Sequence, residues 1–234
     1  MRLVAWNTNY NNHPRRSFEA CVDLLEDFDA DILVLSEVAH PATTHPGSVE
    51  WIGNCSPGLV VVARNGLSVS PSLLNNNAPA NFAAFTVRGR ITFLLLAAWP
   101  VTAPYHQVLM QGLNLFASAT PASPRILAGD LNTSSSVKGQ EQTHPLFVDR
   151  AAALGLSSVY HHMSGEDHGK ESHPTYFRHH KSSNPFHIDY CFVSADLLPS
   201  ASLGIHRGPV RCSQSDHVPL VLDIPDSRFG TQGH

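Results

Sequence analysis

The sequence predicts one domain of the α/β or α+β class, in which β-sheets are covered by helices. Short apolar runs with strand character recur along the chain and alternate with segments of helical periodicity, which is typical of a layered fold. The chain has 234 residues, 42% of them hydrophobic and 15% charged, enough to bury one substantial core. No internal repeat and no low-complexity linker divides it, so we expect residues 1–234 to form a single domain.

The first elements form a predicted β-α-β unit. Residues 2–6 and 32–36 are apolar runs typical of buried strands, and residues 14–28 between them carry apolar side chains at helical spacing. Pro14 would occupy the first turn of this helix. Glu37 follows the second strand directly, and a loop containing proline and glycine comes next.

The rest of the chain predicts further strands and two more helices. Arg88, Gly89 and Arg90 separate two strands as a hairpin turn would. Gly155 would end the last helix, and a long polar segment is expected over residues 161–185. The predicted strands are 59–63, 81–87, 91–98, 125–128, 188–193 and 218–224, and the helices are 104–116 and 145–154.

Composition excludes several classes of protein. Fifteen basic residues against nineteen acidic ones give a formal charge of -4, so contact with a nucleic acid would be local or bridged by a metal. No apolar stretch approaches the roughly 20 residues that cross a bilayer, so no membrane span is expected. No secretory leader is evident and the cysteines lack metal-ligand spacing, which predicts a cytoplasmic protein with reduced thiols at Cys21, Cys55, Cys191 and Cys212.

Polar residues with catalytic potential lie at the ends of the apolar runs. Strand ends open into loops, where side chains from distant segments can meet and face solvent. Each of these residues alone has an ordinary structural explanation, such as a turn, a helix cap or a buried hydrogen bond. Together they predict one site, built from Asn7, Glu37, Asp130 with Asn132, Asp189, and Asp216 with His217.

These motifs, in this order, resemble the endonuclease/exonuclease/phosphatase family and a compact bacterial branch of it. The resemblance covers nearly the whole chain and rests on Trp6-Asn7, Glu37, Gly129-Asp130-Leu131-Asn132, Pro174-Thr175-Tyr176, His187-Ile188-Asp189-Tyr190 and Ser215-Asp216-His217. It implies a four-layer sandwich of two packed, mixed β-sheets flanked by helices, with the site at one end. It also implies an enzyme that hydrolyses phosphoester bonds.

The resemblance further implies the role of each site residue. Glu37 would be the principal ligand of Mg²⁺ (or Mn²⁺), with Asn9 and Asp216 as direct or water-mediated ligands, because hard oxygen donors suit this ion. Asn7 would orient Asp130, and Asn132 would contact a phosphate oxygen or the attacking water. His217 would lie against the phosphate with Asp189 on its other nitrogen. The general base stays open between Asp130 and His217, with Asp130 favoured.

Two departures from the family pattern concern single positions. Trp99 stands where relatives carry a His or Tyr that contacts the phosphate, and an indole can donate one hydrogen bond but cannot carry charge. Trp99 is therefore either a substrate contact or a packing residue. Asn9 stands where some relatives have Asp, which lowers the ligand charge.

The histidines are crowded between residues 161 and 187. Such clustering can indicate an extra transition-metal site, but the spacings match no tetrahedral template, so a solvated loop is favoured. Within this region Arg178, His180 and Lys181 could contact phosphates that flank the scissile one.

The leading expectation is a Mg²⁺-dependent nuclease that acts on a nucleic acid, DNA first and RNA second. The main alternative is a phosphatase or phosphodiesterase for a small phosphoester or a lipid headgroup, which the net acidity favours. A catalytically inactive binding module is less favoured, because it would not need Glu37, Asp130, Asn132, Asp189 and His217 together. No obligate protein partner is evident from the sequence.

Overall fold

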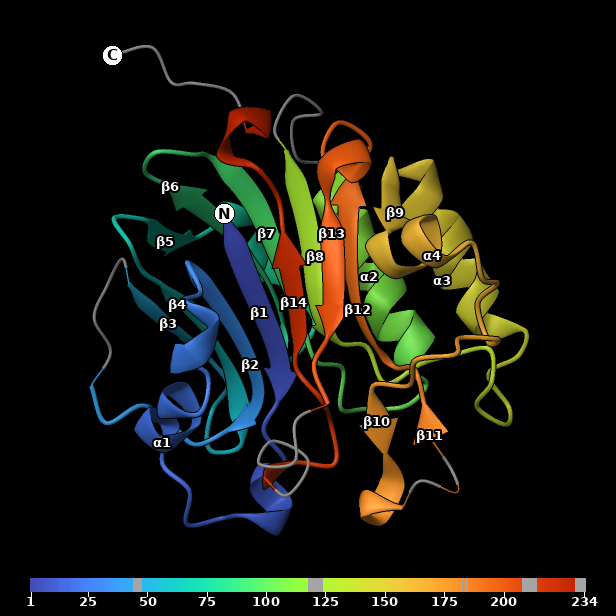
Figure 1. Ribbon diagram of the computed structural model, residues 1–234, viewed down its shortest axis with the longest axis horizontal. Coiled ribbons are helices and arrows are strands. Elements are labelled where there is room, and N and C mark those ends of the chain that lie inside the picture. The colour runs from blue at the N-terminus through green and yellow to red at the C-terminus, as the bar shows by residue number, and fades with distance from the viewer. Residues whose placement is uncertain (44–47, 118–123, 182, 184, 208–213, 230–234) are drawn as a thin grey trace.

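The computed structural model contains two six-stranded β-sheets that pack face to face, with helices on both outer faces (Figure 1). It describes residues 1–43, 48–117, 124–181, 183, 185–207 and 214–229. The four-layer α+β sandwich implied by the family resemblance is confirmed.

The first sheet contains strands from both the N-terminal and the C-terminal parts of the chain. Strands β1 and β2 are parallel, and every other neighbouring pair in this sheet is antiparallel. The strands, in spatial order, are β13 (Ser202–Ile205), β14 (Leu220–Asp223), β1 (Arg2–Asn7), β2 (Ile32–Val38), β4 (Gly58–Ala63) and β3 (Val49–Ile52).

The second sheet carries the middle of the chain. Strands β7 and β8 are parallel, and the other pairs are antiparallel. The strands, in spatial order, are β5 (Ser68–Pro71), β6 (Phe82–Arg88), β7 (Phe93–Ala98), β8 (Arg125–Asp130), β12 (Asp189–Ser194) and β9 (Leu156–Ser158).

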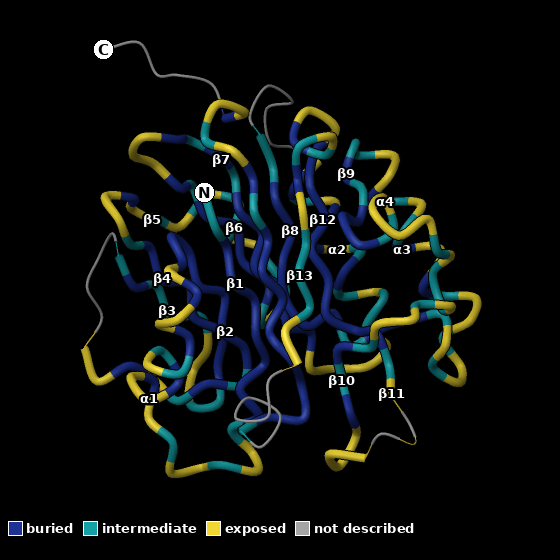
Figure 2. The backbone as a smooth tube through the Cα atoms, viewed as in Figure 1, coloured by how far each residue is buried: buried dark blue, intermediate teal, exposed yellow. Residues whose placement is uncertain are grey.

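Alternation along the strands explains the layers. In β1, Leu3 and Ala5 enter the core between the sheets, whereas Val4 and Trp6 pack outward against α1 (Phe18–Asp23). The second sheet does the same toward α2 (Tyr105–Ala117) and α3 (Thr143–Ala153). Both faces of both sheets are therefore covered, which is why the central strands are almost wholly buried in Figure 2, whereas the border strands β3, β5 and β13 are partly exposed.

Smaller elements complete the chain. Helix α4 (Val159–Ser164) follows β9, and a short hairpin of β10 (Tyr176–Phe177) and β11 (Pro185–Phe186) projects at one end of the sandwich (Figure 1). Single turns of 3-10 helix lie at Tyr10–Asn12, Glu26–Phe28, Leu73–Asn77, Arg178–His180, Leu198–Ser200 and Asp226–Arg228.

The structure corrects several predicted elements. The helix expected over 14–28 begins only at Phe18, where the Ser17 hydroxyl accepts a hydrogen bond from the Ala20 N–H, so Pro14 lies outside it. The segment expected to be a polar loop from residue 161 begins inside α4. Strands β3, β5, β9 and β13 were not predicted, because they are short and mostly border the sheets.

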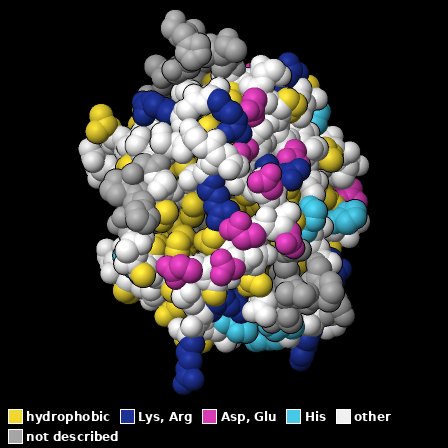
Figure 3. Space-filling model, turned by 60° about the vertical axis from the view of Figure 1, so that its left-hand side comes forward, with side chains coloured by type: hydrophobic (Ala, Val, Ile, Leu, Met, Phe, Trp, Pro, Cys, Tyr) yellow, Lys and Arg dark blue, Asp and Glu magenta, His cyan; other side chains and the backbone are white. Residues whose placement is uncertain are grey.

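Other observations bear on the compositional expectations. No helix in the described part of the chain is long and apolar enough to span a membrane. Cys21, Cys55 and Cys191 are free thiols, while Cys212 lies outside the described residues. On the face shown in Figure 3, Lys and Arg side chains are interspersed with Asp and Glu, so no patch of one sign dominates that face.

Candidate active site

The predicted site residues meet at the end of the sandwich that is lowest in Figure 1, where β10 and β11 lie. Strand register brings them together. Asn7 at the end of β1 pairs with Ser36, directly before Glu37, and Asp130 at the end of β8 pairs with Asp189 at the start of β12. The segment before β14 adds Asp216 and His217, and His217 reaches Asp189.

Asn7 connects the two carboxylates of the site. Its Nδ2 donates to Glu37 Oε1 at 3.1 Å and to Asp130 Oδ2 at 2.8 Å. Its own Oδ1 accepts from the Asn9 N–H at 2.9 Å, which fixes the orientation of the amide. Asn7 is 1% exposed, and its side-chain amide thus connects the end of β1 to both β2 and β8 by hydrogen bonds.

Glu37 has the surroundings of a metal ligand. Burial raises the pKa of its carboxyl, even though Asn7 donates a hydrogen bond to it and His217 lies nearby. The second oxygen accepts from Asn11 Nδ2 at 3.2 Å. A bound cation would offset this burial, and oxygen donors on Glu37, Asn9 and Asp216 suit a hard divalent ion. Asn9 is 5% exposed, and its Oδ1 accepts a hydrogen bond from Asn12 Nδ2 at 2.8 Å. Among the described residues its Nδ2 has no hydrogen-bond partner.

Asp130, Asp189 and His217 form a buried charged triad. His217 Nδ1 lies 2.9 Å from Asp189 Oδ2, and its Nε2 lies 3.9 Å from Asp130 Oδ2. Burial disfavours the imidazolium, but Asp189 and then Asp130 outweigh it and raise the pKa of His217 to about 9. Burial is also the main reason that the pKa of Asp130 rises to about 7. His217 is therefore the positive member of the triad at neutral pH.

Three residues outside the predicted set support His217 and Asp189. Ser215 Oγ donates to the Asn7 carbonyl at 2.7 Å and accepts from the His217 N–H at 3.0 Å. The Tyr176 ring lies 4.5 Å from the imidazole, centroid to centroid. Thr175 Oγ1 accepts from the backbone N–H groups of Ile188 and Asp189, both at 3.1 Å. Thr175, Tyr176 and Ser215 stand inside the quoted motifs, which was the only available sequence signal.

Asn132 and Trp99 lie beside this centre. Asn132 has a positive φ of 53°, its backbone N–H donates to Asp130 Oδ1 at 2.8 Å, and its Nδ2 donates to the Pro100 carbonyl at 3.1 Å. Trp99 is 5% exposed and belongs to the core between the sheets. Packing accounts for this tryptophan, and a contact of its indole with phosphate stays a prediction.

A groove of about 670 Å³ adjoins the triad on the side of β10 and β11. Arg178 and Lys138 supply positive charge to it, and both side chains are exposed. Its other lining residues include Asn132 from the predicted site and the aromatic rings of Tyr105, Tyr176 and Phe186. Of the predicted flanking contacts, Arg178 lines the groove, whereas His180 and Lys181 are exposed on the same turn outside its lining.

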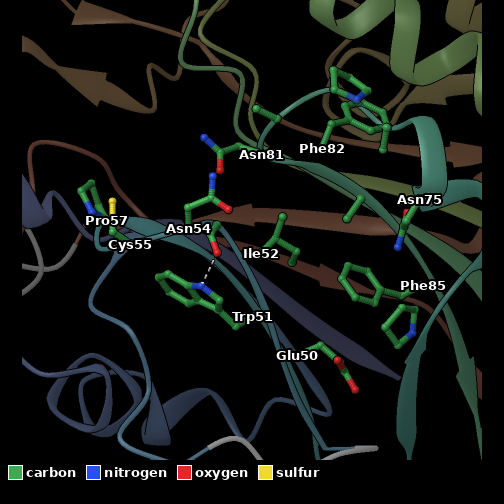
Figure 4. Close-up of a pocket in the computed structure, with 16 residues that line it drawn as sticks. Glu50, Trp51, Ile52, Asn54, Cys55, Pro57, Asn75, Asn81, Phe82 and Phe85 are labelled. Atoms are coloured by element: carbon green, nitrogen blue, oxygen red, sulfur yellow. Dashed lines mark hydrogen bonds between the residues drawn. The ribbon is translucent and has the colours of Figure 1, made fainter.

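A second cleft, of about 600 Å³, opens at the edge where β3 lies near β5 and β6 (Figure 4). Trp51 stands in it with its indole N–H donating to the Gly53 carbonyl at 2.9 Å, and Phe82 and Phe85 face it from β6. None of the predicted site residues lines this cleft, so we assign it no role.

Comparison with known proteins agrees with the geometry. Residues 4–217 match the model of the Endonuclease/Exonuclease/phosphatase family. No curated protein sequence matches the chain significantly.

Solved structures with the same fold share little sequence with this chain. The endonuclease domain of TRAS1, a telomere-specific non-LTR retrotransposon, has a TM-score of 0.69 at 17% identity, covering 95% of this chain and 97% of that one. A 3'-5' exonuclease from Neisseria meningitidis has a TM-score of 0.68 at 16% identity, covering 96% and 99%. A Neisseria 3' phosphatase bound to a product DNA hairpin has a TM-score of 0.69 at 16% identity, covering 96% and 99%.

Fold and site define a hydrolase that acts on phosphoester bonds. Because the family model spans nearly the whole chain, the protein belongs to the endonuclease/exonuclease/phosphatase family, whose members generally use divalent metals.

Proposed function

We propose that this protein is a Mg²⁺-dependent nuclease that hydrolyses phosphodiester bonds in DNA, and that residues 1–234 form one catalytic domain. The groove beside the charged triad carries the proposal. A groove with two cationic side chains and three aromatic rings fits a flexible strand of phosphates and bases better than a single small phosphoester.

Glu37, Asn9 and Asp216 would hold the metal. When bound, the ion would supply Lewis-acid stabilisation of charge on the phosphate oxygens and would lower the pKa of a coordinated water. Asn7 positions Glu37 for this role through its hydrogen bond of 3.1 Å.

In our proposal Asp130 accepts a proton from the attacking water, and His217 donates a hydrogen bond to the phosphate. A carboxyl with a pKa near neutrality can accept a proton from water at physiological pH, and the pKa of Asp130 is about 7. His217, with a pKa of about 9, stays protonated and donates a hydrogen bond from Nε2 to a phosphate oxygen. Asp189 holds the opposite nitrogen, so the proton on Nδ1 stays in place during this contact.

The groove would bind the strand next to the scissile phosphate. Bases can stack on Tyr105, Tyr176 and Phe186, while Lys138 and Arg178 contact the flanking phosphates. Nuclease and DNA-bound relatives with the same fold support this substrate class.

The test is a substrate panel measured with Mg²⁺, with Mn²⁺ and with a chelator. The substrates are supercoiled plasmid, single-stranded DNA, abasic duplex, RNA and bis-p-nitrophenyl phosphate. We expect metal-dependent cleavage of DNA, with a loss of about 10³-fold or more in Glu37→Ala, because the metal ligand supplies several kcal/mol of transition-state stabilisation. Glu141→Ala, which alters an exposed glutamate, is the control and should keep full activity.

The other outcomes discriminate among functions. Cleavage of RNA alone would identify RNA, and not DNA, as the substrate. Activity on bis-p-nitrophenyl phosphate alone would favour a phosphodiesterase for small molecules over a nuclease. No activity on any of these substrates, from a folded protein, would contradict the proposed nuclease and favour the binding module.

A further inference from the structure

A cluster of imidazoles and one carboxylate covers the outer face of β12, apart from the charged triad. We call it the histidine cluster, and its members are His144, His161, His168, Glu171 and His187. Helices α3 and α4 supply His144 and His161. The rings lie against Tyr190 and Phe192, whose side chains belong to the outer core of the second sheet. Asp189 and Cys191, on the alternate positions of β12, face the other way.

Donor atoms in the cluster are close enough to share one ion. His161 Nε2 lies 3.1 Å from Glu171 Oε1, and His144 Nε2 lies 3.2 Å from His168 Nδ1. One ligand atom from each of His161, His168 and Glu171 falls within 4.8 Å of the others. Ligands around a tetrahedral Zn²⁺ are separated by roughly 3.3 Å, given bonds of about 2.0 Å, so small side-chain movements would close the site.

Three of the histidines are anchored by the ring nitrogen that faces away from the cluster. His161 Nδ1 lies 2.8 Å from Ser158 Oγ, and His144 Nδ1 lies 3.3 Å from Thr133 Oγ1. His187 Nδ1 donates to the His173 carbonyl at 2.8 Å. In each ring Nε2 is left for the cluster. Metal-ligating histidines are typically held in this way, because the outer hydrogen bond fixes both tautomer and ring orientation.

The Glu171 carboxylate lies inside the cluster. Its side chain is only 3% exposed, and its Oε1 lies 3.1 Å from His161 Nε2 and accepts a hydrogen bond from the Gly169 N–H at 3.0 Å. A buried carboxylate beside imidazole nitrogens supplies the anionic ligand that a bound cation would need.

His187 gives an independent indication of a ligand. Its side chain is buried, with 2% of the residue exposed, and no residue that the structure describes offers its Nε2 a hydrogen-bond partner. An unpaired nitrogen of this kind costs free energy unless something binds it. His187 lies outside the group of three whose ligand atoms are within 4.8 Å of one another, and its ring is 6.0 Å from that of His161, centroid to centroid. It would therefore join the ion as a fourth ligand after a side-chain movement.

We propose that His161, His168 and Glu171, with His187 as the fourth ligand, bind one transition-metal ion, which their donor chemistry identifies as Zn²⁺. Three imidazoles and one carboxylate suit Zn²⁺, whereas the all-oxygen set around Glu37 suits Mg²⁺, so the two sites select different metals. A shallow cleft of about 290 Å³ is lined by His161 and His168 and offers a route for the ion from solvent.

The metal would fasten the segment after α4 to the body of the second sheet. That segment continues directly into Thr175, which accepts a hydrogen bond from the Asp189 N–H, and Tyr176, whose ring lies against His217. The Zn²⁺ site is therefore a stabilising clamp behind the triad, and its existence does not depend on the identity of the substrate.

The test measures Zn²⁺ binding and thermal unfolding of the full chain after dialysis against a chelator. A Glu37→Ala background removes the main ligand of the other metal site. We expect one Zn²⁺ per chain, a rise in Tm on adding Zn²⁺ but not Mg²⁺, and a visible absorption band with Co²⁺. His168→Ala should weaken Zn²⁺ binding by about 100-fold or more and abolish the rise in Tm.

Two further variants keep this test decisive. Glu171→Gln preserves side-chain volume and should also lose the Zn²⁺ site, so a folding defect in His168→Ala would not hide the result. His162→Ala removes an exposed histidine next to His161 and should bind Zn²⁺ like the parent protein. Equal Zn²⁺ affinity in the parent, His168→Ala and Glu171→Gln would overturn the proposal, as would a parent protein that binds no Zn²⁺.

Discussion

At the scale of single residues, the surroundings of His217 determine its charge. Two carboxylates raise its pKa to about 9, so the imidazolium predominates below that pH and is lost as the pH rises through it. If the protonated form contacts the phosphate, kcat should fall on the alkaline side with an apparent pKa near this value.

Asp189→Asn tests this assignment. Removing the charge that most raises the pKa of His217 should move the alkaline limb of the pH-rate profile to lower pH by about one unit or more. The measurement is kcat against pH at saturating metal. Asp196→Asn, an exposed position beyond the end of β12, should leave the profile unchanged. An identical alkaline limb in Asp189→Asn and the parent would show that His217 does not act as an imidazolium.

The residues of the triad could be predicted from the sequence, but their contacts could not. Asp130, Asp189 and His217 each adjoin an apolar strand, so their position in the chain pointed to the site. The bond of Ser215 to Asn7 joins residues 208 positions apart in the chain, and the bond of Thr175 to Asp189 depends on how the segment before β10 returns to β12. For the histidines between residues 161 and 187 the sequence favours a solvated loop, because their spacings match no tetrahedral metal-binding template.

At the scale of elements, close contact between β7 and β8 requires a glycine. Gly129 has a φ of +140°, and a Cβ there would lie 2.1 Å from the Ala98 carbonyl oxygen. This backbone places Asp130, the next residue, at the strand end. Both the close contact with β7 and the positive φ therefore require glycine at position 129.

Gly129→Ala should destabilise the fold by roughly 2 kcal/mol or more, because it combines a strained φ with a clash against backbone. For a domain of this size that corresponds to a fall in Tm of about 4 °C or more. Gly139→Ala is a matched control, since Gly139 also has a positive φ, +86°, but nothing lies within 4 Å of its Cβ position. Equal loss of Tm in the two variants would show that the contact with Ala98 is unimportant.

The first helix shows the limit of periodicity at this scale. Apolar residues at helical spacing continue to Phe28, yet α1 ends after Asp23 and the chain continues as a 3-10 turn that Asp29 closes with a positive φ of 48°. Phe28 is buried without being part of α1. A buried apolar position therefore marks contact with the sheet, not continuation of the helix.

At the scale of the whole molecule, charge limits how the protein can bind a nucleic acid. The net charge is -4, and the face in Figure 3 mixes both signs. Long-range attraction of a polyanion is therefore weak, and binding must depend on a few local contacts in the groove, chiefly Arg178 and Lys138.

This limit predicts a shallow salt dependence for oligonucleotide binding. Each phosphate contact contributes about 0.7 to 0.9 to the slope of log K against log salt, so two or three contacts give a slope of roughly -2. Arg178→Ala should weaken binding across sequences and reduce the magnitude of the slope by about 1. Fluorescence anisotropy measures both, in an Asp130→Asn background that blocks turnover. Arg64→Ala is the control, because Arg64 follows the last residue of β4 and does not line the groove, and this variant should retain the parent slope. An unchanged slope in Arg178→Ala would place the nucleic acid outside this groove.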